Sequence, residues 1–350
     1  MNAEAYFLEQ PAEPLVKRDL PVGEPGAGEV VIEVEACGLC HTDLSYASGS
    51  VAPRHPLPLV LGHEITGRVV AAGDGAGDLA GKSVLVPAVL PCGDCEYCAA
   101  GRGNACPRQK MPGNDVHGGF ASHVLLPAGA LIPVDDAPQG IGLDVLAVVA
   151  DAVSTAYQAI RRADLEEGDA AIVVGAGGVG GFLLQIASAL GAHTIACDVA
   201  PERLESAAAY GAEHTVDVAG RDGREVRKEL RGVLAGWRVP TLRQRVFESS
   251  GTADGQLLAY GLLGSAATLV LVGYTFDKLK VRLSNLMAFD ATVHGTWGCP
   301  PAAFPAVLEM IYDGRVVLEP FVDHAPMSEL NRLLDDMTHH RLTKRMILHP

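Results

Sequence analysis

The run Ala171-Ile172-Val173-Val174-Gly175-Ala176-Gly177-Gly178-Val179-Gly180 decides the fold class of this chain. Its apolar start, followed at once by a G-x-G-x-x-G turn, predicts a buried strand, a tight turn and the start of a helix. We expect that helix over 182–190, a strand over 194–197 and a second helix over 202–210. Further strands are expected at 246–248, 269–272 and 292–294, and an exposed helix at 224–234. Such alternation indicates an α/β domain built from parallel βαβ units.

The same run predicts a dinucleotide site. Its glycines let the turn approach a pyrophosphate, which would lie at the positive end of the following helix. Asp198 follows the next strand at about the separation, roughly 20 residues, at which a carboxylate meets the adenosine ribose, and this favours NAD over NADP. Arg203 either supports the ribose or is an ordinary exposed helix residue. The expected cofactor contacts are Gly175, Gly177, Gly178, Val179, Gly180, Asp198 and Arg203.

Length and composition limit the classes of function. A chain of 350 residues with 48% hydrophobic residues and 40 glycines suits two domains rather than one core. The net charge of −15 argues against nucleic-acid binding, which needs a basic surface. Residues 170–192 carry no charge, but the glycines in their first half favour a strand, turn and helix over a membrane span. Residues 1–14 do not resemble a signal peptide, so we expect a cytoplasmic protein with no membrane partner.

The N-terminal half is rich in β-forming residues. Short runs at 30–35, 65–70 and 83–86 predict an antiparallel barrel or sandwich. Pro53, Pro56 and Pro58 break regular structure between the first two runs. We therefore expect loops rather than helices to carry the polar residues of this region.

Two polar clusters in this half predict a metal site. Cys40 lies in a C-G-L-C-H-T-D run at 37–43, and His63 lies in a G-H-E run at 62–64. Zinc favours thiolate and imidazole ligands, and a catalytic zinc keeps three protein ligands and one open position. The separation is too long for a zinc-finger hairpin, so the fold has to bring the two residues together. Alone, they are also compatible with a buried thiol and a hydrogen-bonded core histidine.

A C-x2-C-x2-C-x7-C pattern is a stronger signal. Four thiolates saturate tetrahedral coordination, which is the arrangement of a structural zinc site. An iron–sulfur cluster is the alternative, but the wide final spacing and the lack of a second cysteine set favour one mononuclear zinc. In a reducing compartment these cysteines are unlikely to form disulfides. The expected ligands are Cys92, Cys95, Cys98 and Cys106.

The combination of these motifs resembles the zinc-dependent medium-chain alcohol dehydrogenases over essentially the whole chain. The resemblance implies a GroES-like catalytic domain at 1–152 and 296–350, with a structural zinc loop at 92–106. It places a Rossmann NAD-binding domain, an α/β domain with a doubly wound parallel sheet, at 153–295. It implies an enzyme that uses NAD and two zinc ions to oxidise a secondary alcohol, a small-molecule substrate, and that forms a homo-oligomer, either dimer or tetramer.

The ligands of the catalytic zinc follow from the same resemblance. They would be Cys40, His63 and a third residue at the start of the Rossmann segment, which is usually a cysteine and is Asp151 here. A carboxylate is a legitimate zinc ligand, and together with one thiolate it neutralises the ion as two thiolates do. Asp151 is also compatible with a simple helix N-cap.

The resemblance assigns roles to five further residues. Thr42 would take the proton of the substrate, Glu64 would lie behind the zinc, and Asp43 would orient His63. Glu64 and Asp43 are otherwise compatible with solvated carboxylates. The remaining two residues, His41 and Arg345, would lie near the cofactor pyrophosphate.

Local strings indicate one branch of the family. Segments 86–89, 91–95, 101–104 and 110–114, with Asp151, are similar to dehydrogenases of a cyclic hydroxyacyl-CoA thioester in anaerobic aromatic degradation. A cationic cluster would steer such an anionic thioester onto an acidic protein. These cations are equally compatible with lysines that guard an exposed strand edge. The cluster comprises Lys278, Lys280 and Arg282.

Two other functions fit parts of the pattern. Metal-free relatives with this architecture reduce enoyl substrates, but the retained Cys40 and His63 argue against that activity here. A structural or regulatory protein that binds NAD without catalysis is the other alternative. In such a protein, a complete set of zinc ligands and proton-relay residues would be surplus.

Overall fold

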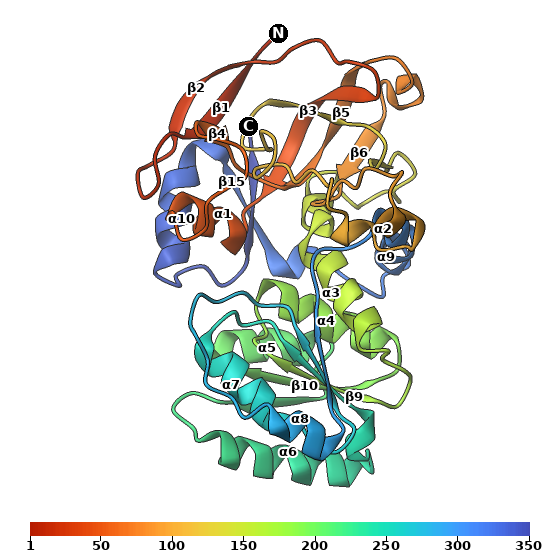
Figure 1. The fold of residues 1–350 in the computed structure, drawn as a ribbon, viewed down its shortest axis with the longest axis vertical. Coiled ribbons are helices and arrows are strands. Elements are labelled where there is room, and N and C mark those ends of the chain that lie inside the picture. Colours follow the sequence, from red (N-terminus) through yellow and green to blue (C-terminus); the bar gives the residue numbers. More distant parts are fainter. The chain divides into compact units, whose positions relative to one another are not determined.

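The computed structural model describes residues 1–350, which divide into two compact units (Figure 1). Unit 1 comprises Met1–Ser154 with Gly298–Pro350, and unit 2 comprises Thr155–Trp297. These boundaries lie two residues from the expected ones at 152/153 and 295/296. The predicted fold class, a β-rich GroES-like part with a Rossmann part, is confirmed.

Unit 1 is built on two sheets, as expected for a barrel or sandwich. The larger sheet has the order β15-β16-β3-β5-β6-β8, with β7 paired to β3, and only the β15–β16 pair is parallel. Its strands are β3 (Glu29–Gly38), β5 (Glu64–Ala72), β6 (Ser83–Val86), β7 (His123–Pro127), β8 (Ile132–Pro133), β15 (Val322–Pro326) and β16 (Arg345–His349). The smaller sheet, of order β2-β1-β4, contains β1 (Asn2–Leu8), β2 (Val16–Pro21) and β4 (Leu59–Val60).

The core of unit 1 forms because inward-facing strand residues alternate with exposed ones. Ile32 and Val34 of β3, Ile65 of β5, and Phe120 all lie in one cluster of buried residues. The C-terminal strand β16 joins this core by pairing with β3, so residues far apart in sequence share one sheet. This return of the chain brings Arg345 into unit 1.

The helices of unit 1 correct one sequence-based expectation. A helix, α1, begins directly after Cys40, so the prediction that loops alone carry this region is wrong for 41–47. The proline-rich stretch 53–58 itself contains no helix or strand, as expected. The helices and 3-10 turns are α1 (His41–Ala47), η1 (Gly77–Leu79), α2 (Glu96–Ala99), η2 (Gly103–Ala105), η3 (Val145–Ala150), η5 (Pro301–Ala303), α9 (Phe304–Tyr312), η6 (Glu319–Phe321), η7 (Met327–Glu329) and α10 (Leu330–Thr338).

Unit 2 is a six-stranded sheet in which every pairing is parallel. Its order is β11-β10-β9-β12-β13-β14, the doubly wound order in which the chain starts centrally and builds outward on both sides. The strands are β9 (Ala170–Val174), β10 (His193–Asp198), β11 (His214–Asp217), β12 (Gln244–Glu248), β13 (Thr268–Leu271) and β14 (Thr292–Gly295). All predicted strands of this unit are present, with ends that differ by at most two residues.

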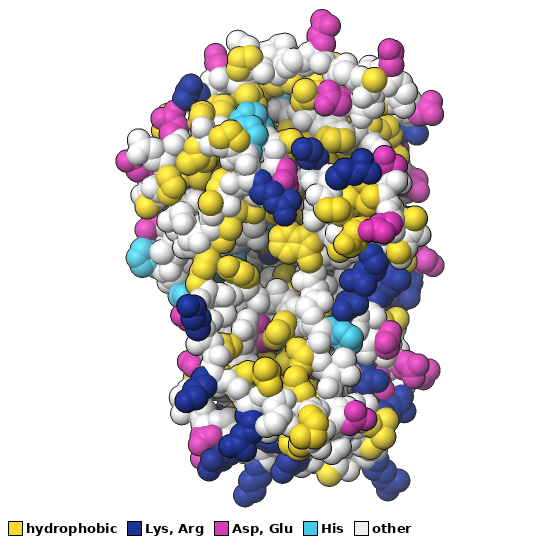
Figure 2. Space-filling model, in the orientation of Figure 1, with side chains coloured by type: hydrophobic (Ala, Val, Ile, Leu, Met, Phe, Trp, Pro, Cys, Tyr) yellow, Lys and Arg dark blue, Asp and Glu magenta, His cyan; other side chains and the backbone are white.

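The helices of unit 2 begin or end differently from their predicted ranges. The helix expected over 182–190 begins at Gly178, because the last glycines of the turn already adopt helical geometry. The exposed helix extends to 223–237, and Asp222 caps it by accepting a hydrogen bond from the Arg224 amide. Figure 2 shows lysine and arginine side chains gathered over the end of this unit that α6 forms. The helices are α3 (Ala152–Arg162), whose first residues belong to unit 1, α4 (Gly178–Ala189), α5 (Pro201–Ala209), α6 (Gly223–Trp237), η4 (Thr241–Arg243), α7 (Ala253–Leu262) and α8 (Ser284–Phe289).

The uncharged stretch 170–192 is divided as predicted. It forms β9, a glycine turn and α4. None of the helices combines the length and the apolar character that crossing a bilayer requires.

Candidate metal centres and dinucleotide site

The position of Cys40 is fixed by the start of α1. Cys40 has extended backbone geometry (φ −117°, ψ 155°) and occupies the N-cap position of the helix. Asp43, in the first turn, accepts a hydrogen bond from the Cys40 amide at 3.0 Å through Oδ2. This contact is half of a capping box, and it holds the backbone that carries the thiol.

The second oxygen of Asp43 positions His63. Asp43 Oδ1 accepts a hydrogen bond from the Gly62 amide at 3.1 Å and lies 3.2 Å from His63 Nδ1. Both side chains are almost completely buried. Burial alone lowers the pKa of His63, but the charges of Asp43 and Cys40 more than offset it and raise that pKa well above its usual range. Asp43 thereby directs Nε2, the other ring nitrogen, as a ligand-orienting carboxylate does.

Asp151 brings a carboxylate to the same point. Its Oδ2 lies 3.7 Å from Cys40 Sγ and 3.7 Å from His63 Nε2. One potential ligand atom from each of Cys40, His63, Glu64 and Asp151 lies within 4.8 Å of all the others. Thiolate, imidazole and carboxylate at this spacing form a donor set that fits one zinc ion. An N-cap role alone does not account for these contacts.

Glu64 and Arg345 form a buried ion pair beside this cluster. Arg345 Nε donates to Glu64 Oε2 at 2.8 Å, and Arg345 Nη2 donates to Glu64 Oε1. The Ala152 amide also donates to Glu64 Oε1, at 3.2 Å. Burial lowers the pKa of Arg345, but Glu64 more than offsets it and raises that pKa further above its usual range. Glu64 is therefore held beside a permanent cation.

Two aspects of this pair were not visible in the sequence. Arg345, predicted near a cofactor pyrophosphate, also lies with its Nη2 3.7 Å from Asp151 Oδ2. Gly38 packs against Glu64 so closely that a Cβ at position 38 would overlap Glu64 Oε2. No spacing rule links these residues, because four separate segments of unit 1 supply them.

The remaining residues of the first polar cluster lie on α1. Thr42 is half-buried in the first turn, one residue before Asp43, and His41 is exposed at the first position of the helix. Ser45 Oγ donates to the His41 carbonyl at 2.9 Å, so this hydroxyl is tied to the helix backbone. The helix thus presents Thr42 next to the capping residue Cys40.

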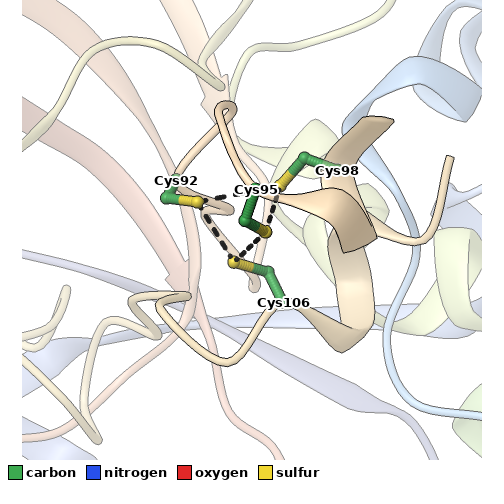
Figure 3. A group of neighbouring side chains, drawn as sticks. All are labelled: Cys92, Cys95, Cys98 and Cys106. Atoms are coloured by element: carbon green, nitrogen blue, oxygen red, sulfur yellow. Dashed lines mark hydrogen bonds between the residues drawn. The ribbon is translucent and has the colours of Figure 1, made fainter. Parts of the chain in front are cut away.

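The four cysteines of the segment 92–106, which we call the four-thiol lobe, converge on one point, as Figure 3 shows. Four of the Sγ–Sγ separations are 3.4, 3.5, 3.6 and 3.9 Å. Tetrahedral zinc with Zn–S bonds of about 2.3 Å places its sulfur atoms about 3.8 Å apart. The cysteines therefore fit a single ion, and sulfur atoms this close leave no room for a multi-iron cluster.

The local backbone supports thiolate ligands in this lobe. A backbone hydrogen bond from Cys98 lowers the pKa of Cys95 to about 6. The Arg108 amide donates to Cys106 Sγ at 3.3 Å, and the Arg108 side chain pairs with Asp94. A hydrogen bond with Asp94 acts in the opposite direction and raises the pKa of Cys92 to about 12, so these surroundings favour the thiolate at Cys95 and oppose it at Cys92.

The glycine turn of unit 2 connects β9 to α4 as predicted. Gly175 has a positive φ of 94°, and a Cβ on Gly180 would overlap the Gly175 carbonyl oxygen, so both positions require glycine. Gly177, the N-cap residue of α4, has extended geometry, and Gly178 and Val179 follow as the first helical residues. The turn thus leads directly into the helix N-terminus, where backbone amides attract anions.

Asp198 lies at the carboxyl end of β10 against this turn. Its Oδ2 accepts from the Ala176 amide at 2.7 Å, and its Oδ1 accepts from the Ala200 amide at 2.9 Å. Arg203 Nη1 is 3.9 Å from Asp198 Oδ1. The carboxylate is therefore fixed at the end of the strand where dinucleotides bind in doubly wound sheets.

Comparisons with known proteins agree with this geometry. Residues 26–136 match the alcohol dehydrogenase GroES-like domain family, and residues 178–313 match the zinc-binding dehydrogenase family. The chain is 30% identical to a NAD-dependent alcohol dehydrogenase of Sulfolobus acidocaldarius, over 99% of each protein. Among solved structures, it superposes on an alcohol dehydrogenase of Thermotoga maritima with a TM-score of 0.88 at 26% identity, over 100% of each chain. It superposes on acetophenone reductase of Geotrichum candidum, in complex with NAD, with a TM-score of 0.86 at 27% identity, over 100% of this chain and 97% of that one.

The two cysteine-containing centres predict two zinc ions per chain. Elemental analysis of the purified protein should give two equivalents. Cys98→Ser should remove one and lower the free energy of unfolding by more than about 4 kcal/mol, because structural zinc contributes directly to folding. Cys40→Ser should remove the other and leave urea unfolding nearly unchanged.

Two variants of Asp151 test whether its carboxylate holds the zinc ion at the Cys40 centre. Asp151→Cys replaces the carboxylate by a thiolate, which zinc also favours, and should retain two equivalents, whereas Asp151→Ala should weaken binding of one. A single equivalent in the unaltered protein would contradict the assignment of one of the two centres. Two tightly held equivalents in Asp151→Ala would contradict the carboxylate as a ligand.

Proposed function

Because the chain belongs to the zinc-dependent medium-chain alcohol dehydrogenases, a family of oxidoreductases, we propose that it oxidises a secondary alcohol to a ketone with NAD as the hydride acceptor. The observation that carries this proposal is the convergence of Cys40, His63 and Asp151 on one point of unit 1. Three such donors leave one coordination position for a substrate.

Each residue of the cluster has a task in this reaction. Cys40, His63 and Asp151 would hold the ion, and the charges of thiolate and carboxylate balance its two positive charges. When bound, zinc acts as a Lewis acid that lowers the pKa of a coordinated hydroxyl. Asp43 keeps the imidazole of His63 in the orientation that directs Nε2 at the ion. Thr42, the residue before Asp43 in α1, would take the proton that leaves the alcohol and release its own hydroxyl proton toward solvent.

Glu64 and Arg345 would set the electrostatics of this centre. The guanidinium balances the Glu64 carboxylate, and it also lies 3.7 Å from Asp151 Oδ2. His41 and Arg345 remain candidates for contact with the cofactor pyrophosphate. The turn at 175–180 would hold the pyrophosphate of a bound NAD, whose nicotinamide would supply the hydride acceptor.

We propose NAD rather than NADP as the physiological cofactor. The support is Asp198, whose buried carboxylate ends β10 beside the glycine turn and would repel a 2′-phosphate. Its oxygens accept backbone hydrogen bonds but retain lone pairs for ribose hydroxyls. Arg203 would assist by packing beside the same site.

The substrate we propose is a cyclic β-hydroxyacyl-CoA. The local strings given above and Asp151 resemble 6-hydroxycyclohex-1-ene-1-carbonyl-CoA dehydrogenase, which forms the 6-oxo product in anaerobic aromatic degradation. Lys278, Lys280 and Arg282 are all exposed and lie between β13 and α8, in a segment without strand structure. They therefore do not guard a strand edge directly, which favours their role in steering an anionic thioester.

The assembly and compartment are also proposals. We propose a homo-oligomer, either a dimer or a tetramer. One support is β14, because it is the last strand of its sheet and could pair with another chain. The other is the pair Leu283 and Met287, apolar side chains near β14 in sequence that are 67% and 78% exposed. Cytoplasmic location is supported by the four-thiol lobe, because its ligands have to stay reduced.

Activity with secondary alcohols tests the proposed reaction. NADH formation should be detected with a panel of cyclic secondary alcohols, each offered as free acid and as CoA thioester, and the thioesters should react faster. Cys40→Ser should lower kcat/KM by more than about 100-fold. No turnover of any alcohol would contradict an alcohol dehydrogenase. Reduction of an enoyl substrate that survives in Cys40→Ser would instead indicate a metal-free conjugate reductase.

The preference of the enzyme for NAD over NADP tests whether the Asp198 carboxylate contacts the adenosine ribose. Asp198→Ala should shift the ratio of kcat/KM for NAD and NADP toward NADP by about 10-fold or more, because hydrogen bonds to a charged group contribute about 1.5–3 kcal/mol. Glu202→Ala, which removes an exposed carboxylate on α5, is the matched control and should leave the ratio unchanged. An unaltered ratio in Asp198→Ala would show that this carboxylate does not face the ribose.

Salt dependence tests the cationic cluster. Neutralising Lys278, Lys280 and Arg282 to Gln should raise KM for the thioester several-fold at low ionic strength, and about 0.5 M salt should erase the difference. The control neutralises three exposed cations of α6 in the same unit, namely Arg224, Lys228 and Arg231. Equal KM values in the unaltered protein and the 278/280/282 variant would remove the cluster from the substrate site. Equal turnover of the free acid and its thioester would contradict recognition of CoA.

A further inference from the structure

A third group of potential ligands lies in unit 1, and the proposed reaction does not use it. His324 Nδ1 is 3.0 Å from His349 Nε2, and Asp144 Oδ2 is 3.6 Å from the first nitrogen and 4.0 Å from the second. Each side chain is about one-third exposed, so solvent reaches all three. Two imidazoles and one carboxylate thus surround a single solvent-accessible point.

These distances match the size of a transition-metal ion. A point in the plane of three atoms separated by 3.0, 3.6 and 4.0 Å lies about 2.1 Å from each of them. Zinc–nitrogen bonds to histidine measure about 2.0–2.1 Å, and zinc–oxygen bonds to carboxylates about 2.0–2.2 Å. The three donor atoms therefore need little movement to bind one ion.

The fold holds the three donors in place from two sides. His324 lies on β15 and His349 on β16, adjacent parallel strands in which His349 pairs with Pro326, two residues after His324. The imidazole rings are stacked with centroids 5.3 Å apart. Because paired strands supply both rings, their separation is set by the sheet and not by a flexible loop.

The Asp144 side chain faces the two histidines and does not cap the helix η3 that follows it. It occupies the N-cap position of η3, yet its side chain accepts no capping hydrogen bond. Its Oδ1 fits against Gly142, where a Cβ would overlap it. An aspartate that does not cap, and that has space to face two imidazoles, is an arrangement that points to a shared cation.

We propose that Asp144, His324 and His349 form a third metal site, which takes a divalent transition ion from solution. Imidazole ligands suit Zn²⁺, Cu²⁺ and Ni²⁺, and of these Zn²⁺ is also well matched by one carboxylate. Water would complete the coordination because the site is open to solvent. This site is separate from the four-thiol lobe and from the cluster at Cys40, and no step of the proposed reaction depends on it.

An ion at this site would join the far ends of two elements that also meet at the candidate catalytic centre. β16 begins at Arg345 and ends at His349, while η3 lies between Asp144 and Asp151. At the other ends of the same elements, Arg345 Nη2 lies 3.7 Å from Asp151 Oδ2. The two sites are separated by about 13 Å along β16, at about 3.3 Å per residue. A bound ion would therefore stabilise the contact between β16 and η3.

Calorimetric titration with ZnCl2 tests the proposal. The protein is first dialysed so that it keeps only the two zinc ions of the cysteine-containing centres. It should then bind one further equivalent of Zn²⁺. His349→Gln and Asp144→Asn should each weaken this additional binding by about 10-fold or more. Added Zn²⁺ should raise the Tm of the unaltered protein more than that of either variant.

The matched control is His339→Gln. His339 is an exposed histidine 3.3 Å from the Asp335 carboxylate and lies outside the 144/324/349 group, so its loss should leave the extra equivalent intact. A variant counts as folded if it retains both zinc ions of the cysteine-containing centres. If His349→Gln or Asp144→Asn does not retain them, His324→Asn is titrated in its place. Absence of a further equivalent in the unaltered protein would overturn the proposal and leave a hydrogen-bonded histidine pair. Undiminished binding in folded His349→Gln and His324→Asn would overturn it equally. Because the measurement is binding and not turnover, its failure is distinct from failure of the proposed enzymatic function.

Discussion

The arrangement of unit 1 depends on one buried ion pair, between Glu64 and Arg345. The two residues begin β5 and β16, strands that lie on either side of β3. Removing charged groups from water is costly, so such a pair persists only when its remaining hydrogen-bonding capacity is satisfied. The Ala152 amide satisfies part of that capacity, and it also places the start of α3, and with it Asp151, beside the pair. The ion pair thus connects three distant segments at the point where the metal ligands meet.

Asp43 adds a second constraint on the same site. One of its carboxylate oxygens caps α1 at Cys40, and the other contacts Gly62 and His63. A single buried side chain therefore fixes both the backbone of one ligand and the ring of another. Since it accepts all these contacts with no exposure to water, any rotation would leave buried donors unpaired. This shared carboxylate explains how the Cys40 thiol, on a helix cap, and the His63 imidazole, on a loop, keep a fixed position relative to each other.

The two cysteine-containing centres differ in what holds them together. The four-thiol lobe lies within 15 consecutive residues, so its short loop brings the sulfurs together with little help from the rest of the fold. Its chemistry was accordingly predictable from spacing. The centre at Cys40 draws its ligands from three segments, and the Asp144 group also draws on three. Neither arrangement has a local signature, because tertiary packing alone brings those residues together.

The sequence by itself determined the alternation of strands and helices in unit 2, the glycine turn and the four-thiol lobe. These features depend on local propensity and on spacing within a few tens of residues. It did not determine where α4 starts, because glycine suits both a turn and a first helical turn, nor did it indicate α1, whose seven residues are too few for a clear periodic pattern. The family resemblance implied that Asp151 joins Cys40 and His63, but only the tertiary structure decided that Arg345 pairs with Glu64 and that Asp144 meets two histidines on β15 and β16. The Arg345–Glu64 contact arises because β16 and β5 both pair with β3, which no pattern within any one segment encodes.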